Sequence, residues 1–251
     1  MCDCKSPRGR GWIGWGPMPE SAPSLAAGPW LDLSHPLSKS VPRAGVFPEP
    51  GFRRVKSLPD DPFNVTEMQM VVHIGTHVDA PRHFFMDGPA FHEIPLDRLS
   101  GPGVVVSVTG KTAGEMIEPR DLAPAAERIR PGDIVALHTG WSDHAGSHAY
   151  HDHPYLSPAA AEWLAVRGIK LLACDLPTPD QPIGRRPAGY DWPAHHILLS
   201  RGILISENVT GLGSIANQRV EFAFMALNIE ESDGAPARVL ARPIREQATA
   251  L

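Results

Sequence analysis

Three histidines and one aspartate fall within eleven residues, His73 to His83, in the segment HIGTHVDAPRH. Each of these side chains needs a polar partner if the fold buries it, and one divalent cation would serve several of them at once. A single histidine in an apolar strand is more often a core residue, whereas four such groups close together favour a metal site. Nitrogen and carboxylate ligands without a nearby cysteine suit Zn²⁺ or Mn²⁺, and the sequence does not separate the two.

The backbone must bend to bring these groups together. A straight strand would place His73 and His77 about 13 Å apart at ~3.3 Å per residue, too far for one ion to bridge comfortably. A helix would turn Asp79 about 120° away from His77. A bend at Gly75–Thr76 avoids both problems, because glycine adopts backbone angles that other residues avoid. We therefore predict a kinked strand that holds a divalent ion with His73, His77 and Asp79, followed by a proline turn that returns His83.

Two histidines and one carboxylate leave coordination positions open around an ion. An open position is typical of a catalytic metal, because water bound there loses its proton near neutral pH. The alternative is a protein that binds metal for structure or sensing, which would surround the ion fully and more often uses cysteine. The ligand set therefore favours an enzyme.

The composition excludes several other classes. The chain has 251 residues, 42% of them hydrophobic, and a net charge of −5, which suits one large domain and argues against nucleic acid as a partner. We find no run of about 18 apolar residues and no apolar export signal, so we expect a cytoplasmic protein without a membrane partner. Three cysteines make no disulfide framework, and Cys2 and Cys4, a C-x-C pair without other ligands nearby, are only a weak signal for a metal site, so we read them as part of the flexible extension.

Two kinds of segment organise the chain. Residues 1–28 are rich in Gly, Pro and Ser, so we predict a flexible extension before one domain over residues 29–251. Alternating or apolar runs bounded by turn formers predict strands. These runs are Trp30–Leu37, Phe63–Ile74, Gly103–Val108, Asp133–Gly140, Gly168–Asp175, Gly202–Asn208 and Phe222–Ile229.

Helices and a loop complete the predicted layout. Ser157 and Pro158 are typical of a helix start, and Pro193 opens a second helix that Gly202 ends. Prolines at 42, 48, 50, 59 and 62 predict a long loop before the histidine cluster. The fold class is therefore mixed α/β, a single domain of layered mixed β-sheets with flanking helices.

Several segments resemble, in the same order, the cyclase family of metal-dependent hydrolases, which includes bacterial kynurenine formamidases and isatin hydrolases. The resemblance spans residues 30–243 and implies that family's layered architecture, of the swivelling β/β/α type, and a homodimer or homotetramer. The segments are LDLSHPL (31–37), HIGTHVDAPRHF (73–84), GDIVALHTGW (132–141), DLPTPD (175–180), PAHHILLSRGILISEN (193–208) and DGAPARVLA (233–241).

The resemblance also implies roles for individual residues. His73, His77 and Asp79 would be metal ligands, and His83 would be the catalytic histidine. As in the two-metal formamidases, Asp79 would bridge to a second ion.

The further ligands of that second ion would be His195 and Glu207, whereas His196 would point about 100° away and serve structure. Some members work with one ion, so one or two are expected. The implied reaction is hydrolysis of a C–N bond in a formamide, amide or lactam, with a lactonase or lyase on the same scaffold as the alternative.

Aromatic residues beside these segments suggest a small, flat substrate. Phe84, Phe85 and Trp141 could wall a pocket, with Phe47 and Phe52 on the proline-rich loop as a lid. The longer loop and an insert over residues 143–155 depart from the formamidase pattern. That insert carries His144, His148, His151 and His153, and we predict a solvated loop near the pocket that binds no ion.

Overall fold

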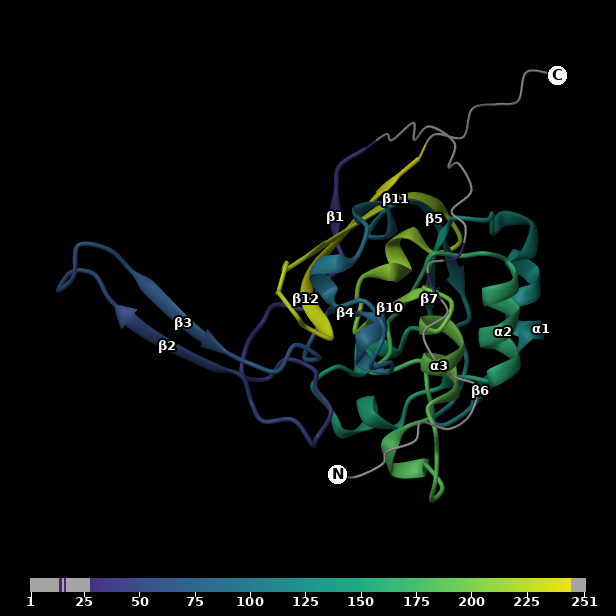
Figure 1. The fold of residues 1–251 in the computed structure, drawn as a ribbon, viewed down its shortest axis with the longest axis horizontal. Coiled ribbons are helices and arrows are strands. Elements are labelled where there is room, and N and C mark those ends of the chain that lie inside the picture. The colour runs from purple at the N-terminus through teal and green to yellow at the C-terminus, as the bar shows by residue number, and fades with distance from the viewer. Residues whose placement is uncertain (1–13, 15, 17–27, 245–251) are drawn as a thin grey trace.

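The protein is described by a computed structural model that covers residue 14, residue 16 and residues 28–244. Most of the predicted extension, including Cys2 and Cys4, lies outside these residues. The described chain forms a mixed α/β domain (Figure 1). None of its described helices is long and apolar enough to cross a bilayer.

One large sheet forms the centre of the domain. Its strand order is β1-β12-β11-β5-β7-β9-β10-β4, and β4 pairs with β12 as well as with β10, so the sheet closes on itself like a barrel. Strands β5, β7, β9 and β10 run parallel, and β4, β11 and β12 are joined in antiparallel fashion. The bounds are β1 Leu31–Asp32, β4 His77–Asp79, β5 Ser100–Ser107, β7 Ile134–His138, β9 Leu171–Cys174, β10 Leu204–Glu207, β11 Arg219–Ala226 and β12 Gly234–Pro243.

Two hydrophobic cores lie on the two faces of this sheet. In β7, Ile134 and Ala136 belong to one core, whereas Val135 and Leu137 belong to the core that also contains helix residues. This alternation follows from the two-residue period of a strand. Both faces are covered, which explains why the predicted strands read as continuous apolar runs.

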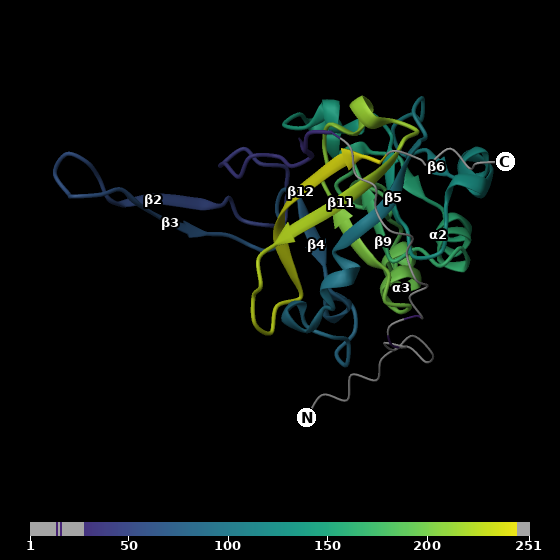
Figure 2. The ribbon, with the colours of Figure 1, turned by 90° about the horizontal axis from the view of Figure 1, so that it is seen from above.

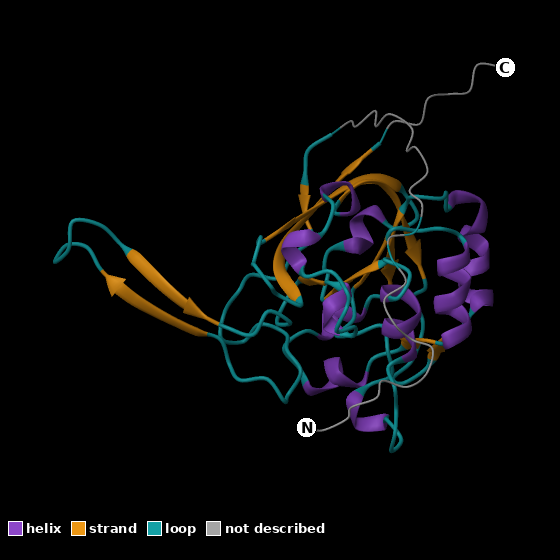
Figure 3. Cartoon of the chain, in the orientation of Figure 1, coloured by secondary structure: helices purple, strands orange, loops and turns teal. Residues whose placement is uncertain are grey.

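The helices begin where the sequence predicts. Helix α2 (Pro158–Val166) starts after Ser157, whose hydroxyl accepts a hydrogen bond from the Ala160 amide at 3.1 Å. Helix α3 (Pro193–Leu199) opens with its proline, and a shorter helix, α1, covers Pro119–Leu122. His196 on α3 packs against the Phe85 ring, with 5.5 Å between ring centroids. Figure 3 shows the helices gathered around the sheet.

A two-stranded arm replaces the predicted loop. Strands β2 (Gly51–Lys56) and β3 (Val65–Gln69) pair with each other and project from the body of the domain (Figure 2). Pro50 and Pro59 flank β2 instead of lying within it, so no ladder hydrogen bond is lost. The strand predicted over Phe63–Ile74 ends at Gln69, because the arm stops before the histidine cluster. A second small sheet pairs β6 (Met116–Ile117) with β8 (Tyr155–Leu156).

Candidate metal centre

The chain bends at the predicted position. Gly75 has a φ of +64°, and a Cβ there would lie 2.6 Å from a methyl carbon of Val41. The next residue fixes the bend, since the Thr76 hydroxyl donates to the Asn208 carbonyl at 2.6 Å and accepts from the His35 amide at 2.9 Å. The Gly-Thr pair therefore joins the bend to two distant segments.

Strand register then brings the functional side chains together. His77 and Asp79 are two residues apart on β4 and share one face, while Val78 packs into the opposite core. The antiparallel pairing of β4 with β10 places Glu207 directly opposite His77. A 3₁₀ turn over Pro81–His83 follows, as the proline predicts, and carries His83 back toward the group.

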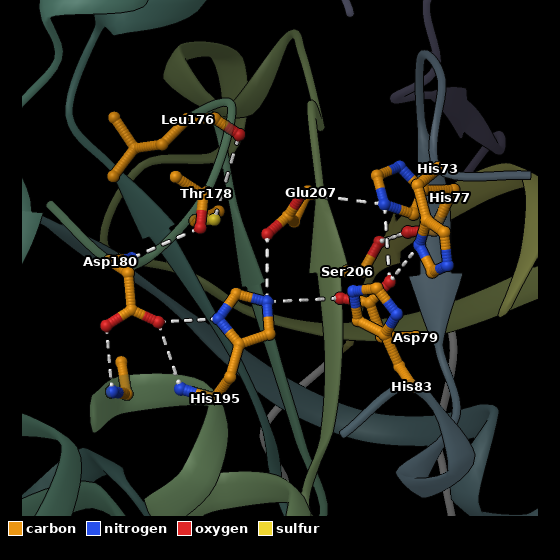
Figure 4. A network of polar contacts seen from close by, with 12 residues as sticks. His73, His77, Asp79, His83, Leu176, Thr178, Asp180, His195, Ser206 and Glu207 are labelled. Carbon is orange, nitrogen blue, oxygen red and sulfur yellow. Dashed lines mark hydrogen bonds and ion pairs between the residues drawn. The ribbon is translucent and has the colours of Figure 1, made fainter. Parts of the chain in front are cut away.

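Asp79 lies at the middle of the cluster (Figure 4). Its Oδ1 is 2.8 Å from His73 Nδ1 and 3.3 Å from His77 Nε2, and its Oδ2 is 3.6 Å from His195 Nε2. Glu207 is 3.5 Å from His77 Nε2 and 3.3 Å from His195 Nε2. The structure thus unites five residues from β4, α3, β10 and the bend, which we call the donor cluster: His73, His77, Asp79, His195 and Glu207.

His83 borders the donor cluster in a more open position. Its ring stacks on His73 with 3.9 Å between centroids and 25° between planes. Its Nδ1 lies 3.5 Å from Asp233 Oδ2, and 27% of its side chain is exposed. His83 is therefore the most exposed histidine of the motif.

Each histidine of the donor cluster uses its second nitrogen to contact an outer partner. Such partners fix the orientation of a ring whose other nitrogen faces a metal. The outer partners are the Gly75 carbonyl for His77 at 2.7 Å, Asp180 for His195 at 2.5 Å and Asp233 for His73 at 3.0 Å.

Neither Asp180 nor Asp233 was predicted from the sequence to take part in the site. Asp180 also accepts hydrogen bonds from the main-chain amides of Ala194 and His195, at 2.9 and 3.1 Å, so it holds the start of α3 and its histidine together. Asp233 precedes β12 and contacts both His73 and His83. Both aspartates occur in segments that carried the family resemblance, which was the only available signal.

The electrostatics of the donor cluster favour positive charge. Burial opposes protonation of His73, but its hydrogen bonds to Asp233 and Asp79 raise its pKa to about 10. Burial likewise opposes protonation of His195, yet the neighbouring carboxylates raise its pKa well above the usual value. Burial would raise the pKa of Asp79, and the surrounding imidazoles hold it well below its usual range.

The donor cluster fits a divalent metal ion. His77 Nε2 and Asp79 Oδ2 are both buried and have no hydrogen-bond partner within the described chain. Buried polar atoms left in that way cost about 1–3 kcal/mol each, and one cation would satisfy both. Nitrogen and oxygen donors suit a divalent transition metal. Among the described residues, two groups have ligand atoms within 4.8 Å of one another: His73, Asp79 and His83, and His77, Asp79 and Glu207.

Comparisons with known proteins identify the family of the chain. The family described as "Putative cyclase" matches residues 31–181. The kynurenine formamidase of Bordetella petrii is 30% identical over 219 residues, covering 85% of this chain and 97% of the relative. The chain belongs to the cyclase family. The kynurenine formamidase of Bacillus thuringiensis, another relative, is 30% identical over 86% of this cyclase-family chain and 98% of its own.

Solved structures share the cyclase-family fold. Isatin hydrolase A from Ralstonia solanacearum aligns with a TM-score of 0.77 at 21% identity, covering 85% of this chain and 91% of that one. A protein from Bacillus stearothermophilus, described as a predicted metal-dependent hydrolase, aligns with a TM-score of 0.71 at 28% identity, covering 86% and 98%. The fold class and family predicted from the sequence are confirmed, and the relatives and the donor cluster agree on a divalent metal.

A cavity of about 630 Å³ opens beside the donor cluster of this cyclase-family protein. Its floor includes His73, His83, His195 and Glu207. Other lining residues come from loops, and we call this group the loop wall. The loop-wall residues are Arg43, Phe47, His148, His151, His153 and Arg186.

Only part of the predicted aromatic pocket lines this cavity. Phe84 and Phe47 do so. Phe85 instead points into the core beside the helices, because it follows Phe84 in a turn that sends consecutive side chains in different directions. Trp141 is buried in the same core, where its Nε1 donates to a main-chain carbonyl at 3.1 Å. Phe52 belongs to β2 of the projecting arm.

The histidine-rich insert is the predicted solvated loop only in part, with His144, His148 and His151 exposed. It lies at the cavity, as expected, but His153 is buried and Tyr150 is fully enclosed. The Tyr150 hydroxyl donates to Asn208 Oδ1 at 2.9 Å, which fixes the insert beside the end of β10. No metal-binding group of described residues includes an insert histidine.

Proposed function

We propose that this protein hydrolyses the C–N bond of an aryl formamide, amide or lactam with the help of a divalent metal ion. The reaction class, metal-dependent hydrolysis of a C–N bond, follows from the family and from the kynurenine formamidases to which the chain is similar. One observation carries the proposal for this chain. His77 Nε2 and Asp79 Oδ2 have no hydrogen-bond partner within the described chain, and they belong to the donor cluster, which borders the cavity that His83 lines.

The donor cluster would hold one or two ions, Zn²⁺ or Mn²⁺. His73, His77 and Asp79 would bind the first ion. Asp79, His195 and Glu207 would bind the second. A divalent ion in such a site lowers the pKa of a bound water molecule and polarises a carbonyl group.

His83 would move the proton. It lies beside the cluster, lines the cavity, and can give a proton to the departing nitrogen. Asp233 contacts His83 Nδ1 at 3.5 Å and so favours the tautomer with Nε2 available to the substrate. Phe84, stacked on His195 at 4.6 Å, offers a flat surface for an aromatic ring.

Replacing His83 by Ala tests this assignment. We expect turnover to fall by about 10²- to 10⁴-fold while the metal content stays the same, because a proton shuttle is lost and the ligands remain. The assay measures formate release from N-formyl aromatic amines, and elemental analysis measures bound metal. His144→Ala is the matched control, since His144 belongs to the insert but does not line the cavity. Loss of metal together with activity would instead make His83 a ligand.

The substrate class is tested in the same assay. Lactams and the matching lactones are compared side by side, with amine release as the readout for C–N cleavage. Faster turnover of the lactones than of every amide would replace the proposal with a lactonase.

We further propose a cytoplasmic homodimer or homotetramer. The lack of a disulfide framework supports the compartment. The β2–β3 arm supports the assembly, because a lone two-stranded hairpin is marginally stable in water and this one exposes Val55, Phe63 and Met68. Light scattering of the purified chain measures the assembly directly.

A further inference from the structure

The histidine-rich insert approaches the donor cluster through one buried side chain, Tyr150. Only 1% of Tyr150 is exposed, and its hydroxyl donates to Asn208 Oδ1 at 2.9 Å. Its main-chain carbonyl accepts a hydrogen bond from Trp141 Nε1 at 3.1 Å, and Trp141 belongs to the same hydrophobic core. The tyrosine is therefore held at its backbone and at its hydroxyl, so the position of the hydroxyl is well defined.

Asn208 joins the insert to the donor cluster, because it directly follows Glu207 in the chain. Its main-chain amide donates to the Leu176 carbonyl at 2.9 Å, and its own carbonyl accepts from the Thr76 hydroxyl at 2.6 Å. Its side chain receives the hydrogen bond from Tyr150. Asn208 is thus bonded to the loop after β9, to the bend beside His77 and to the insert.

The backbone of Asn208 has an unusual conformation that these contacts maintain. Its φ is +54°, in the left-handed region that few residues other than glycine adopt. Such a conformation persists only where the surrounding structure fixes it. Because Glu207 is the last residue of β10, the turn at Asn208 determines where the Glu207 carboxylate lies. That carboxylate faces the Nε2 atoms of His77 and His195, at 3.5 and 3.3 Å (Figure 4).

We propose that Tyr150 is a positioning residue of the metal centre, which acts through Asn208 by fixing the left-handed turn that presents Glu207 to the donor cluster. This inference rests on the metal-binding part of the proposed function and does not depend on the substrate. Outer contacts of this kind raise metal affinity, because the ligand is already ordered before the ion binds. The insert, which departs from the formamidase pattern, therefore contributes to the metal centre as well as to the loop wall.

Tyr150→Phe tests the inference, because it removes the hydroxyl and keeps the buried ring. Competition with a chelating dye measures the affinity of the full-length protein for Zn²⁺ and for Mn²⁺. We expect the affinity to fall by about 3- to 30-fold, somewhat less than for loss of a direct partner of a ligand. With Co²⁺ as the probe, the visible absorption bands report the arrangement of the ligands, and we expect them to change in the variant.

A second variant separates positioning from a general loss of stability. Tyr150→Phe leaves Asn208 Oδ1 without its hydrogen bond, which also destabilises the fold. Ser157→Ala is the matched control, since it removes the cap of α2 and destabilises the fold elsewhere. Urea unfolding measures the loss of stability in both variants. We expect the metal affinity and the Co²⁺ spectrum to change only in Tyr150→Phe.

A double-mutant cycle with Asn208→Gly tests the route. Glycine adopts a φ of +54° without strain but offers the Tyr150 hydroxyl no acceptor. If Tyr150 acts through Asn208, then Tyr150→Phe changes the metal affinity by less than about twofold in the Asn208→Gly background. The same loss in both backgrounds would show that Tyr150 acts by another route and would overturn the inference.

The remaining outcomes distinguish this inference from the proposed function. If Tyr150→Phe binds metal as tightly as the unaltered protein, with the same Co²⁺ spectrum, the inference is wrong and the hydrolase proposal stands. An equal loss of affinity in Ser157→Ala would also overturn it, because stability alone would then explain the effect. If the unaltered protein binds none of the three metals, the inference and the proposed function fail together.

Discussion

Two groups of histidines border the same cavity and have opposite electrostatic environments. In the donor cluster, carboxylates overcome the effect of burial and raise the pKa of His73 and of His195. In the loop wall, burial lowers the pKa of His151 and brings that of His153 to about 4, and nearby cationic groups add to the effect. One group therefore favours cations, and the other stays neutral beside arginines.

This difference separates chemistry from selectivity. The donor cluster lies on β4, β10 and α3, where register and a buried aspartate fix every group. The loop wall comes from the segment before the arm, the insert and the turn before α3. Rigid elements suit metal binding, whereas loops can change with the substrate. We therefore expect substitutions in the donor cluster to abolish activity and substitutions in the loop wall to alter specificity.

The largest effect is expected for Asp79→Asn. This change keeps the shape but removes the charge shared by His73, His77 and His195. Breaking such a buried arrangement costs several kcal/mol, so kcat/KM should fall by about 10³-fold or more, with loss of bound metal. Elemental analysis and formate release measure both quantities. Asp87→Asn, an exposed neighbour, is the control. Retained metal in Asp79→Asn would contradict the assignment of metal binding to the donor cluster and of specificity to the loop wall.

The elements that carry the donor cluster could be predicted because their signals are local. Apolar runs between turn formers predicted β7, β9 and β10, and a proline start predicted α3. The bend at Gly75 followed from the distance that one ion can bridge. His73, His77 and Asp79 are near one another in sequence, so their meeting needed only one turn.

Contacts between distant segments left no such signal. Asp233 reaches His73 only because β12 pairs with β4, with Gly234 opposite Asp79, when the sheet closes. Nothing within the neighbouring residues reveals that closure. Phe85 shows that nearby residues can be misassigned as well, because closeness in sequence to a site residue does not decide which way a side chain points. The positions of cavity-lining residues such as Arg186 depend on loop shape, which no periodicity encodes.

A smaller effect is expected for Asp180→Asn, which tests how much an outer partner contributes to metal affinity. The amide oxygen can still accept a hydrogen bond from the start of α3, but the negative charge beside the His195 ring is lost. Loss of a partner of this kind weakens metal binding by about 10- to 100-fold. Competition with a chelating dye measures the affinity. Asp143→Asn, outside the cavity, serves as the control. Unchanged affinity would show that His195 is oriented without Asp180.

The burial of His153 in the loop wall predicts that the free energy of unfolding decreases at acidic pH. Burial lowers the pKa of its imidazole to about 4 in the folded protein, below the value of about 6.5 in the unfolded chain. As the pH falls below 6.5, His153 binds a proton in the unfolded chain but not in the folded protein. The free energy of unfolding therefore decreases until the pH reaches the pKa of the folded state. Between pH 7 and pH 5 this lowers the free energy of unfolding by about 2 kcal/mol.

Urea unfolding of the protein and of His153→Gln isolates the contribution of His153, because both proteins share all other titrating groups. The variant should lose about 2 kcal/mol less than the unaltered protein over that interval, and equal losses would mean that the pKa of His153 is the same in the folded and the unfolded chain.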